Sequence, residues 1–371
     1  MKTLALVVDA FGFFGGPERR AFRIIKGLRK YQGYKPVIIS IMQPDASTIK
    51  KAEKDSINVI GITNEGNSSL KSYRIDVFLK LRKVIQSINP DLVFTFEFLA
   101  DYTTKMALLG IGLPIYTFIG STTWKWEKKL HRKIAMRVFV KKSRKYIVNS
   151  KNVKENVIRV LPSTKDKIEL IYNPIDTDYF KPLEYKNKIA SRKKYKLGAD
   201  DFIIGSVVRF YNPKGADTLI EAFYKADIDA KLVLVGSGSQ RKMLEKMVED
   251  LKIKDRVIFL GALEADKTIY GMFDMCVIPS QKGGFDNVVI ESMACGVPTI
   301  ATKSTGIEEI AKNNEDLLIT DIDAESIGKN MKFLFRNYNK LGNKLSVNGR
   351  NLIENKLSIK LVAGSIGALI K

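Results

Sequence analysis

The chain has 371 residues, 45% of them hydrophobic, so one ordinary core is too small for it and two domains are expected. With 62 basic and 40 acidic residues its formal net charge is +22, which favours nucleic acid, phosphorylated small molecules or an anionic membrane as partners. A lysine-rich genome is the alternative cause of this charge. Cys276 and Cys295 follow no disulfide or metal spacing, and no apolar run suits a signal peptide or the roughly 18–20 residues of a membrane span.

The first half of the chain alternates short apolar runs with helical patterns. The run 4–8 is continuously apolar, which is typical of a strand buried on both faces, and a loop then leads to a helix that Pro17 opens. Strands alternating with helices form parallel sheets, so we expect a doubly wound α/β domain here. Further strands are predicted at 37–41, 59–62, 92–96, 115–118, 146–148 and 168–171.

The loop 11–20 contains Gly15 and Gly16 directly before this first helix. Glycines permit positive φ and a close approach of a ligand to the backbone, so both are candidates for contact with a phosphate or a sugar. A pair of glycines is also common in a plain turn, and that alternative stays open.

The segment 124–145 carries ten basic residues and one acidic residue, together with both tryptophans of the chain. Trp126, Leu130, Ile134 and Val138 recur every four residues, which predicts an apolar stripe on a basic helix. Such a helix suits an anionic membrane surface. The alternative is that the stripe packs on the first domain and the basic face is solvated. His131, the only histidine, is expected on the surface of this helix.

The pattern breaks at 173–182, and seven basic residues follow between Lys181 and Lys196, so we place the domain junction here. Residues 1–175 and 176–357 are the two predicted domains, facing each other across a cleft, with ligands at the carboxyl ends of their strands. Three Asp-x-Asp sequences are interpreted as turns, and no metal site or cofactor is predicted. The second domain's strands are expected at 202–208, 231–235, 257–260, 276–278, 299–301 and 317–320.

Two cations follow the first strand of the second domain. Arg209 leaves the strand end, and Lys214 stands beside Gly215 where a helix begins. A guanidinium fork and a compact ammonium near a helix N-terminus suit a diphosphate group. The alternative is a pair of solvated surface cations.

The next strand ends in a Gly-x-Gly turn at 236–238. A dinucleotide fingerprint would need a further glycine, which is absent because Gln240 and Arg241 follow. Gly236 and Ser237 are candidates for contact with a nucleotide, and a plain turn is the alternative.

The stretch 279–301 predicts a turn, a helix from 287 to 295 that Gly296 ends, and a strand. The helix N-terminus presents unpaired backbone N–H groups that suit an anion or a ring of hydroxyls. Glu291 lies one turn into this helix and is suited to bind a ribose diol, unless it is only a surface charge. Backbone groups for such a ligand are expected at Gly284, Phe285, Asp286, Asn287 and Val288.

These motifs resemble those of the retaining group 1, or family 4, glycosyltransferases of the GT-B fold. Residues 283–298 are similar to the family's Glu-Gly-Phe-x-x-Val-x-x-Glu-Ala-Met-Ala-x-Gly-x-Pro motif. Residues 209–222 are similar to its motif with Arg and Lys-Gly, and residues 15–19 are similar to its Gly-Gly-x-Glu-Arg motif. The resemblance implies that Arg209 and Lys214 neutralise the leaving diphosphate. It also implies that the Gly236 turn lies near the base and that helix 358–371 returns to the first domain.

Two positions depart from the family pattern. Gly283 stands where the family has a glutamate near the donor sugar, and Ile119-Gly120 stands where it often has His-Gly. These departures lower the expected activity or change the donor preference, but they leave the diphosphate site intact.

The resulting expectation is a cytoplasmic glycosyltransferase, peripheral to the inner face of the membrane, that builds bacterial lipopolysaccharide or capsule-type glycans. The donor would be a UDP-sugar, or else a GDP-sugar, and the acceptor a lipid-linked or polysaccharide glycan. The alternative is a catalytically weak GT-B subunit that binds nucleotide or scaffolds a partner. A nucleic-acid binder is not favoured, because no motif for base readout is found. The sugar, the linkage and the oligomeric state are not predicted.

Overall fold

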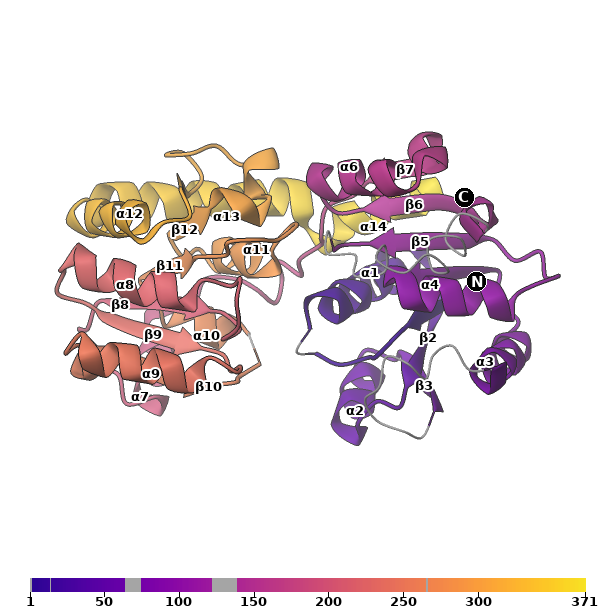
Figure 1. The fold of residues 1–371 in the computed structure, drawn as a ribbon, viewed down its shortest axis with the longest axis horizontal. Helices are drawn as coiled ribbons and strands as arrows, with labels where there is room; N and C mark the ends of the chain where they lie inside the picture. Colours follow the sequence, from indigo (N-terminus) through magenta and orange to yellow (C-terminus); the bar gives the residue numbers. More distant parts are fainter. Residues whose placement is uncertain (1, 14, 64–74, 122–138, 265) are drawn as a thin grey trace. The chain divides into compact units, whose positions relative to one another are not determined.

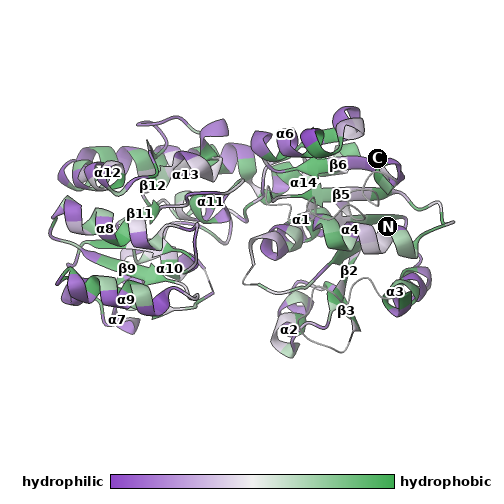
Figure 2. Ribbon diagram, viewed as in Figure 1, coloured by the Kyte–Doolittle hydropathy of each residue, from purple (hydrophilic) through white to green (hydrophobic). Residues whose placement is uncertain are grey.

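The computed structural model describes residues 2–13, 15–63, 75–121, 139–264 and 266–371. Residues 1–174 and 359–371 form one compact unit, unit 1, and residues 175–358 form the other, unit 2 (Figure 1). Each unit is a parallel sheet with helices on both faces, as the alternation of strands and helices predicts. Figure 2 shows the hydrophobic residues concentrated in the strands and on the sides of the helices that cover them.

Unit 1 holds a seven-stranded parallel sheet in the order β3-β2-β1-β4-β5-β6-β7. The order reverses between β1 and β4, and parallel sheets bind ligands at such a point, beyond the carboxyl ends of the strands. The strands are β1 Thr3–Val8, β2 Lys35–Met42, β3 Asn58–Thr63, β4 Leu92–Phe96, β5 Ile115–Ile119, β6 Ser143–Val148 and β7 Ile168–Leu170. The helices are α1 Gly16–Gln32, α2 Ala46–Lys54, α3 Ile75–Ile88, α4 Glu97–Ala107, α6 Lys151–Val160 and α14 Ile359–Leu369.

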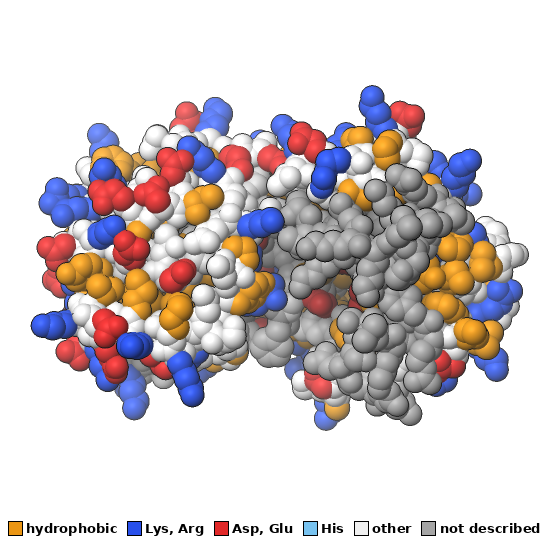
Figure 3. All heavy atoms as spheres, viewed as in Figure 1, with side chains coloured by type: hydrophobic (Ala, Val, Ile, Leu, Met, Phe, Trp, Pro, Cys, Tyr) orange, Lys and Arg blue, Asp and Glu red, His pale blue; other side chains and the backbone are white. Residues whose placement is uncertain are grey.

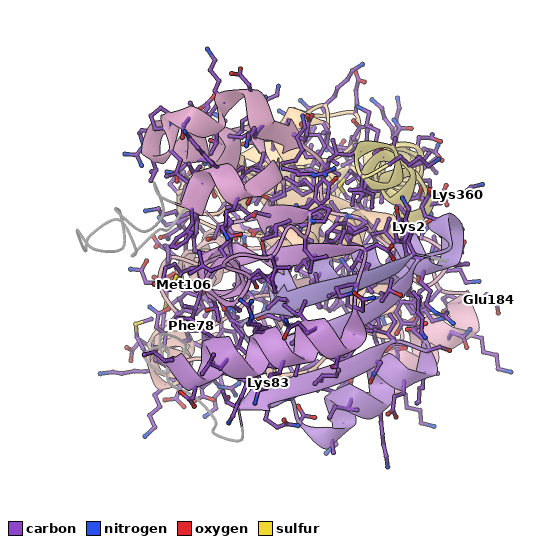
Figure 4. All side chains as sticks on the ribbon, turned by 90° about the vertical axis from the view of Figure 1, so that its right-hand side faces the viewer. Lys2, Phe78, Lys83, Met106, Glu184 and Lys360 are labelled. Carbon is purple, nitrogen blue, oxygen red and sulfur yellow. The ribbon has the colours of Figure 1, made fainter. Side chains whose placement is uncertain are left out.

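Two faces of the unit 1 sheet are covered by different helices. On one face α1 packs with the C-terminal helix α14, and Gly27 permits this because a Cβ there would lie 2.9 Å from Ile359 and 3.0 Å from Ala363. On the other face α3 packs beside α4, where the ring centres of Phe78 and Tyr102 lie 6.2 Å apart; Figure 4 labels Phe78 of α3 and Met106 of α4. The apolar strands are thus buried on both sides.

The segment 124–145 lies partly outside the described residues, because 122–138 are not among them. The described remainder is not helical to residue 145. Val140–Lys142 is a short 3₁₀ turn, and Ser143 begins β6. The predicted helix end is therefore wrong: residues 143 and 145 pair with β5, and this long-range pairing overrides the local helical pattern.

Unit 2 holds a six-stranded parallel sheet in the order β10-β9-β8-β11-β12-β13, with its reversal between β8 and β11. Short 3₁₀ or π turns complete both units at 162–167, 254–256, 303–305, 307–309 and 338–342. The strands are β8 Ile203–Val207, β9 Lys231–Val235, β10 Val257–Gly261, β11 Met275–Ile278, β12 Thr299–Thr302 and β13 Leu318–Thr320. The helices are α7 Tyr185–Lys194, α8 Ala216–Ala226, α9 Arg241–Asp250, α10 Lys267–Gly271, α11 Asn287–Ala294, α12 Ala324–Arg336 and α13 Asn343–Leu357.

The formal net charge of the chain is +22. In Figure 3 lysine and arginine side chains are scattered over the visible face of each unit, with acidic side chains between them. None of the helices in the described ranges combines the length and the apolar character needed to cross a bilayer.

Candidate functional site

The loops that follow β8 and β11 pack against each other at the reversal point of the unit 2 sheet. The backbone amide of Gln281 donates to the Pro213 carbonyl at 3.1 Å, and its side-chain amide donates to the Thr218 hydroxyl at 2.9 Å. Gly215 has φ +77, and a Cβ there would overlap the Pro279 carbonyl oxygen. Only glycine therefore lets the start of α8 approach the end of β11 this closely.

Lys214, which comes from the first of these loops, meets an acidic residue of the second. Its Nζ lies 3.4 Å from Oδ1 of Asp286, and each side chain is only 19% exposed. The Ser280 hydroxyl donates to Oδ2 of the same carboxylate at 2.6 Å. Asp286 is the N-cap residue of α11, yet its side chain makes no capping bond. The carboxylate thus binds Lys214 and Ser280 in place of the helix amides that an N-cap aspartate normally accepts from.

Arg209 lies just beyond the end of β8, after Val208, as expected from the sequence. Its side chain is exposed, and its guanidinium carbon lies 5.1 Å from the centre of the Tyr211 ring. The structure therefore places a reachable guanidinium in the same loop as Lys214.

The turn before α11 is held by the segment that follows β12. The Asp286 amide donates to the Thr305 carbonyl at 3.0 Å, and a Cβ at Gly306 would lie 2.6 Å from the Gly284 carbonyl oxygen. Among the five predicted backbone contacts, Phe285 and Asn287 are buried, whereas Gly284, Asp286 and Val288 are partly exposed. The partly exposed residues are the ones that a ligand can reach.

Glu291 has no exposed surface in α11. Its Oε2 accepts a hydrogen bond from the Tyr270 hydroxyl at 2.6 Å, and Tyr270 is also fully buried. The phenol therefore fixes the orientation of this carboxylate inside unit 2, a contact that spacing within the helix does not reveal.

The position of Gly283 is next to the carboxylate of Asp286. A Cβ at residue 283 would lie 3.4 Å from Oδ1 of Asp286 and 3.3 Å from the Ser304 carbonyl oxygen. An acidic group is therefore present beside position 283 although residue 283 is glycine.

The Gly-x-Gly turn after β9 packs on the loop that follows β8. A Cβ at Gly236 would overlap the Val208 carbonyl oxygen, and one at Gly238 would overlap that of Phe210. The Phe210 amide donates to the Ser237 carbonyl at 2.9 Å, while Ser237 itself is exposed. Close packing of two loops is a sufficient reason for these glycines.

In unit 1, Gly15 precedes α1 and Gly16 begins it. A Cβ at Gly15 would overlap the carboxylate of Glu18, which folds back over this position. Both glycines are partly exposed, so the start of α1 is accessible.

The sequence interpretation missed a second group of polar residues in unit 1: Asp9, Arg20, Glu97 and Asn149. Asp9 follows β1, Glu97 follows β4 and Asn149 follows β6, so all three stand at the carboxyl edge of the sheet. Polar residues placed directly after predicted parallel strands are the signal that would have found them.

Comparison with known proteins assigns families to both halves of the chain. Residues 14–179 match the family described as Glycosyltransferase Family 4, and residues 187–352 match Glycosyl transferases group 1. Both halves therefore match glycosyltransferase families. The family resemblance of the sequence is confirmed at this level.

Curated relatives align over part of their length. An uncharacterized glycosyltransferase of Methanocaldococcus jannaschii is 36% identical over 45% of this chain and 44% of the relative. The lipopolysaccharide core biosynthesis glycosyltransferase LpsE of Rhizobium meliloti is 31% identical over 45% of this chain and 49% of the relative. The aligned region thus spans less than half of each of these relatives.

Among solved structures, Anabaena HepE in complex with UDP-glucose superposes with a TM-score of 0.85 at 19% identity, covering 99% of both chains. This likeness concerns the fold. Together with the two parallel sheets, it confirms the expected α/β fold of the GT-B class.

Proposed function

We propose that this chain is a metal-independent, retaining glycosyltransferase. It would move a sugar from a nucleotide-diphosphate sugar to a lipid-linked or polysaccharide acceptor in bacterial cell-surface glycan biosynthesis. The observation that carries the proposal is the contact of Lys214 and Ser280 with Asp286 on two loops at the reversal point of the unit 2 sheet, with Arg209 in the same loop as Lys214. This is where a parallel sheet binds ligands, and the group lies in the half that matches group 1 glycosyltransferases.

The two cations would neutralise the diphosphate as it leaves. Lys214 is held 3.4 Å from Asp286, and its ammonium has three N–H donors, so it can keep this contact and still donate to a phosphate oxygen. Arg209 is exposed and offers a bidentate fork. Charge that develops on the leaving oxygen is therefore met by positive groups already in place, which is the largest contribution to catalysis in many enzymes.

The other donor contacts follow from the same loops. Glu291, which is fully buried against Tyr270, is proposed to bind the ribose once its carboxylate is uncovered. The partly exposed residues Gly284, Asp286 and Val288 would contact the sugar through their backbone. Gly236 and Ser237 would lie near the base. Gly15 and Gly16 of unit 1 are proposed to approach the phosphate or the sugar.

Asp286 is proposed to supply the acid that Gly283 lacks. Its Oδ1 lies 3.4 Å from the Cβ position of residue 283, and Ser280 holds the other oxygen. The Asp286 carboxylate can therefore accept a hydrogen bond from a sugar hydroxyl near position 283. It takes the place of the glutamate that the family has at residue 283 itself.

Retention would follow from a dissociative transfer in which the leaving diphosphate and the attacking hydroxyl act on the same face of the sugar. Such a reaction depends on stabilising the diphosphate and on positioning, both of which the unit 2 group can provide. No resident cofactor is required for these roles.

The donor is proposed to be a UDP-sugar, with a GDP-sugar as the second choice; the UDP-glucose complex of the structural neighbour HepE supports a uridine nucleotide. The lipopolysaccharide role of the Rhizobium relative supports a bacterial surface glycan as acceptor. We place the enzyme in the cytoplasm at the inner face of the membrane, with the basic segment 124–145 toward anionic lipid.

Incubation of the purified chain with labelled UDP- and GDP-sugars and a bacterial lipid extract tests the proposal. Labelled lipid or polysaccharide product is expected, and Arg209→Ala and Lys214→Ala should each lower its formation about 100-fold or more. Lys242→Ala, which removes an exposed cation of α9, is the matched control and should keep full activity. Nucleotide binding without transfer or donor hydrolysis would support a non-catalytic subunit instead.

A further inference from the structure

Four chain segments meet at the carboxyl edge of the unit 1 sheet. Asp9 follows β1, Glu97 begins α4 without an intervening loop after β4, Gly120 follows β5 and Asn149 follows β6. Arg20 reaches this edge from α1. None of these side chains belongs to the diphosphate group of unit 2.

Three of the side chains converge on Gly120. A Cβ at this glycine would lie 3.1 Å from Nη1 of Arg20, 3.2 Å from Nδ2 of Asn149 and 3.3 Å from Oε1 of Glu97. The Glu97 carboxylate accepts the Gly120 amide at 2.9 Å and the Ser121 hydroxyl at 3.1 Å. Any larger residue at 120 would separate these polar groups.

Glu97 has a backbone conformation that is unusual for its type. Its φ is +64, in the left-handed region that costs a non-glycine residue about 1 kcal/mol or more. This conformation turns the chain from β4 directly into α4 and brings the carboxylate to Gly120.

Buried polar atoms at this edge lack hydrogen-bond partners in the described part of the chain. Arg20 is 2% exposed; its Nη1 donates to the Ile119 carbonyl at 3.3 Å, whereas its Nε and Nη2 have no partner there. Asn149 is 3% exposed, and its Oδ1 has no partner, nor has Oδ1 of Asp9. Buried polar atoms are nearly always paired, so these donors and acceptors together point to a polar ligand.

The guanidinium of Arg20 is fixed by aromatic rings. Its central carbon lies 5.8 Å from the Phe96 ring and 5.6 Å from the Phe118 ring, and the two rings stack at 4.6 Å. The unpaired nitrogens are therefore held in place by packing.

The charges at this edge do not suit an anion. Burial and the neighbouring carboxylates of Glu97 and Glu18 raise the pKa of Asp9 to about 8, and burial raises the pKa of Glu97. Asp9 is therefore mostly protonated at neutral pH, but the carboxylates of Glu97 and Glu18 still outnumber the Arg20 guanidinium, so a phosphate would be repelled. The guanidinium in turn opposes a metal ion. Carboxyl, amide and guanidinium groups together donate and accept hydrogen bonds, as sugar hydroxyls do.

We propose that Arg20, Glu97 and Asn149 form a subsite that binds neighbouring hydroxyls of a neutral sugar, with Asp9 at its edge. This rests on the proposed function and adds the substrate contacts of unit 1. The same hydroxyl chemistry is present in an acceptor sugar and in the sugar of the donor.

Binding of methyl α-glucoside, methyl α-galactoside and N-acetylglucosamine to the full chain, measured by saturation-transfer NMR, tests the subsite. At least one of these neutral sugars should bind, and Glu97→Gln and Asn149→Ala should each weaken it by about 10-fold or more. Glu155→Gln, which alters an exposed carboxylate of α6, is the matched control and should bind as the unchanged chain does. Inorganic phosphate should not compete.

UDP binding separates this proposal from the function proposed above. The two variants should keep the UDP affinity of the unchanged chain within about twofold, because UDP is assigned to unit 2. A UDP affinity retained within this range also indicates that the variants are folded. If UDP binds but no neutral sugar does, if both variants keep full sugar affinity, or if phosphate competes, the subsite is refuted. If sugars bind and UDP does not, the donor site fails and the subsite stands.

Steady-state kinetics then identify which sugar is bound. A raised KM for the acceptor alone in Glu97→Gln assigns the subsite to the acceptor, and a raised KM for the donor alone assigns it to the donor sugar. A fall in kcat with both KM values unchanged would contradict a binding role and leave Glu97 with a structural one.

Discussion

Replacing Asp9 by Asn should stabilise the protein, and the gain should grow with pH. The folded-state pKa of Asp9 is about 8, against an ordinary value of 3.8, because the carboxyl is buried near Glu97 and Glu18. Between these two values the folded chain holds a proton that the unfolded chain has released. Stability therefore falls as pH rises from about 4 to about 8, at up to about 1.4 kcal/mol per pH unit.

The size of the effect follows from this shift. Over the whole interval the cost of ionising Asp9 reaches about 6 kcal/mol at most. The carboxyl is buried, but the residue as a whole keeps some exposed surface, so nearby water screens the ionised form; the expected gain in Asp9→Asn is therefore about 2–3 kcal/mol at pH 8, with almost none at pH 4. Asn keeps an oxygen that can accept the Ala100 amide, so this contact is not the source of the difference.

Urea unfolding of both proteins at pH 4 to 8 measures the gain. Far-UV circular dichroism follows the loss of the helices, and a difference between the two proteins is assigned to unit 1, where the substitution lies. Asp166→Asn, a change at an exposed position of unit 1, should show no such growth with pH. A gain in Asp9→Asn that is constant with pH, or that decreases toward pH 8, would refute the reasoning.

Three further changes test other parts of the structure. Lys105→Met should lower the free energy of unfolding of unit 1 by about 3–5 kcal/mol in urea. Nζ of Lys105 lies 2.6 Å from Oδ2 of Asp101, both residues are buried, and the substitution leaves the charge of Asp101 without its cation. Adding Asp101→Asn should recover part of the loss. Gly215→Ala should lower stability by about 1–3 kcal/mol and weaken UDP binding in calorimetry, because a Cβ overlaps the Pro279 carbonyl oxygen and φ is +77. Asp286→Ala should lower kcat by about 10-fold or more with nucleotide affinity unchanged or higher, since Lys214 loses its carboxylate partner; an unchanged kcat would exclude Asp286 from the donor-sugar contact.

Much of the fold could be predicted from local pattern. Continuous apolar runs mark strands buried on both faces, and the predicted strand 4–8 is found as β1, Thr3–Val8. The predicted helix 287–295 is found as α11, Asn287–Ala294, with Gly296 at φ +67 just beyond it. These features depend on residues close together in the chain, so the sequence is sufficient to reveal them.

The parts of the site that depend on one loop could also be anticipated. Arg209, Lys214 and Gly215 belong to a single strand–loop–helix segment, so their spacing alone indicates that the cations stand near a helix start. By contrast, the helix predicted to residue 145 ends earlier, since pairing with β5 draws Ser143 into β6.

Only the tertiary structure brings together residues that are distant in sequence. Arg20, Glu97, Gly120 and Asn149 meet because β4, β5 and β6 are neighbours in the sheet and α1 packs near their carboxyl ends. The partnership of Asp286 with Lys214 likewise needs β8 to lie beside β11. Side-chain periodicity is set within a few residues of the chain, whereas strand order is set by burial of whole elements. For this reason the sequence determines which segments carry polar groups, and the folded sheets decide which of those groups meet.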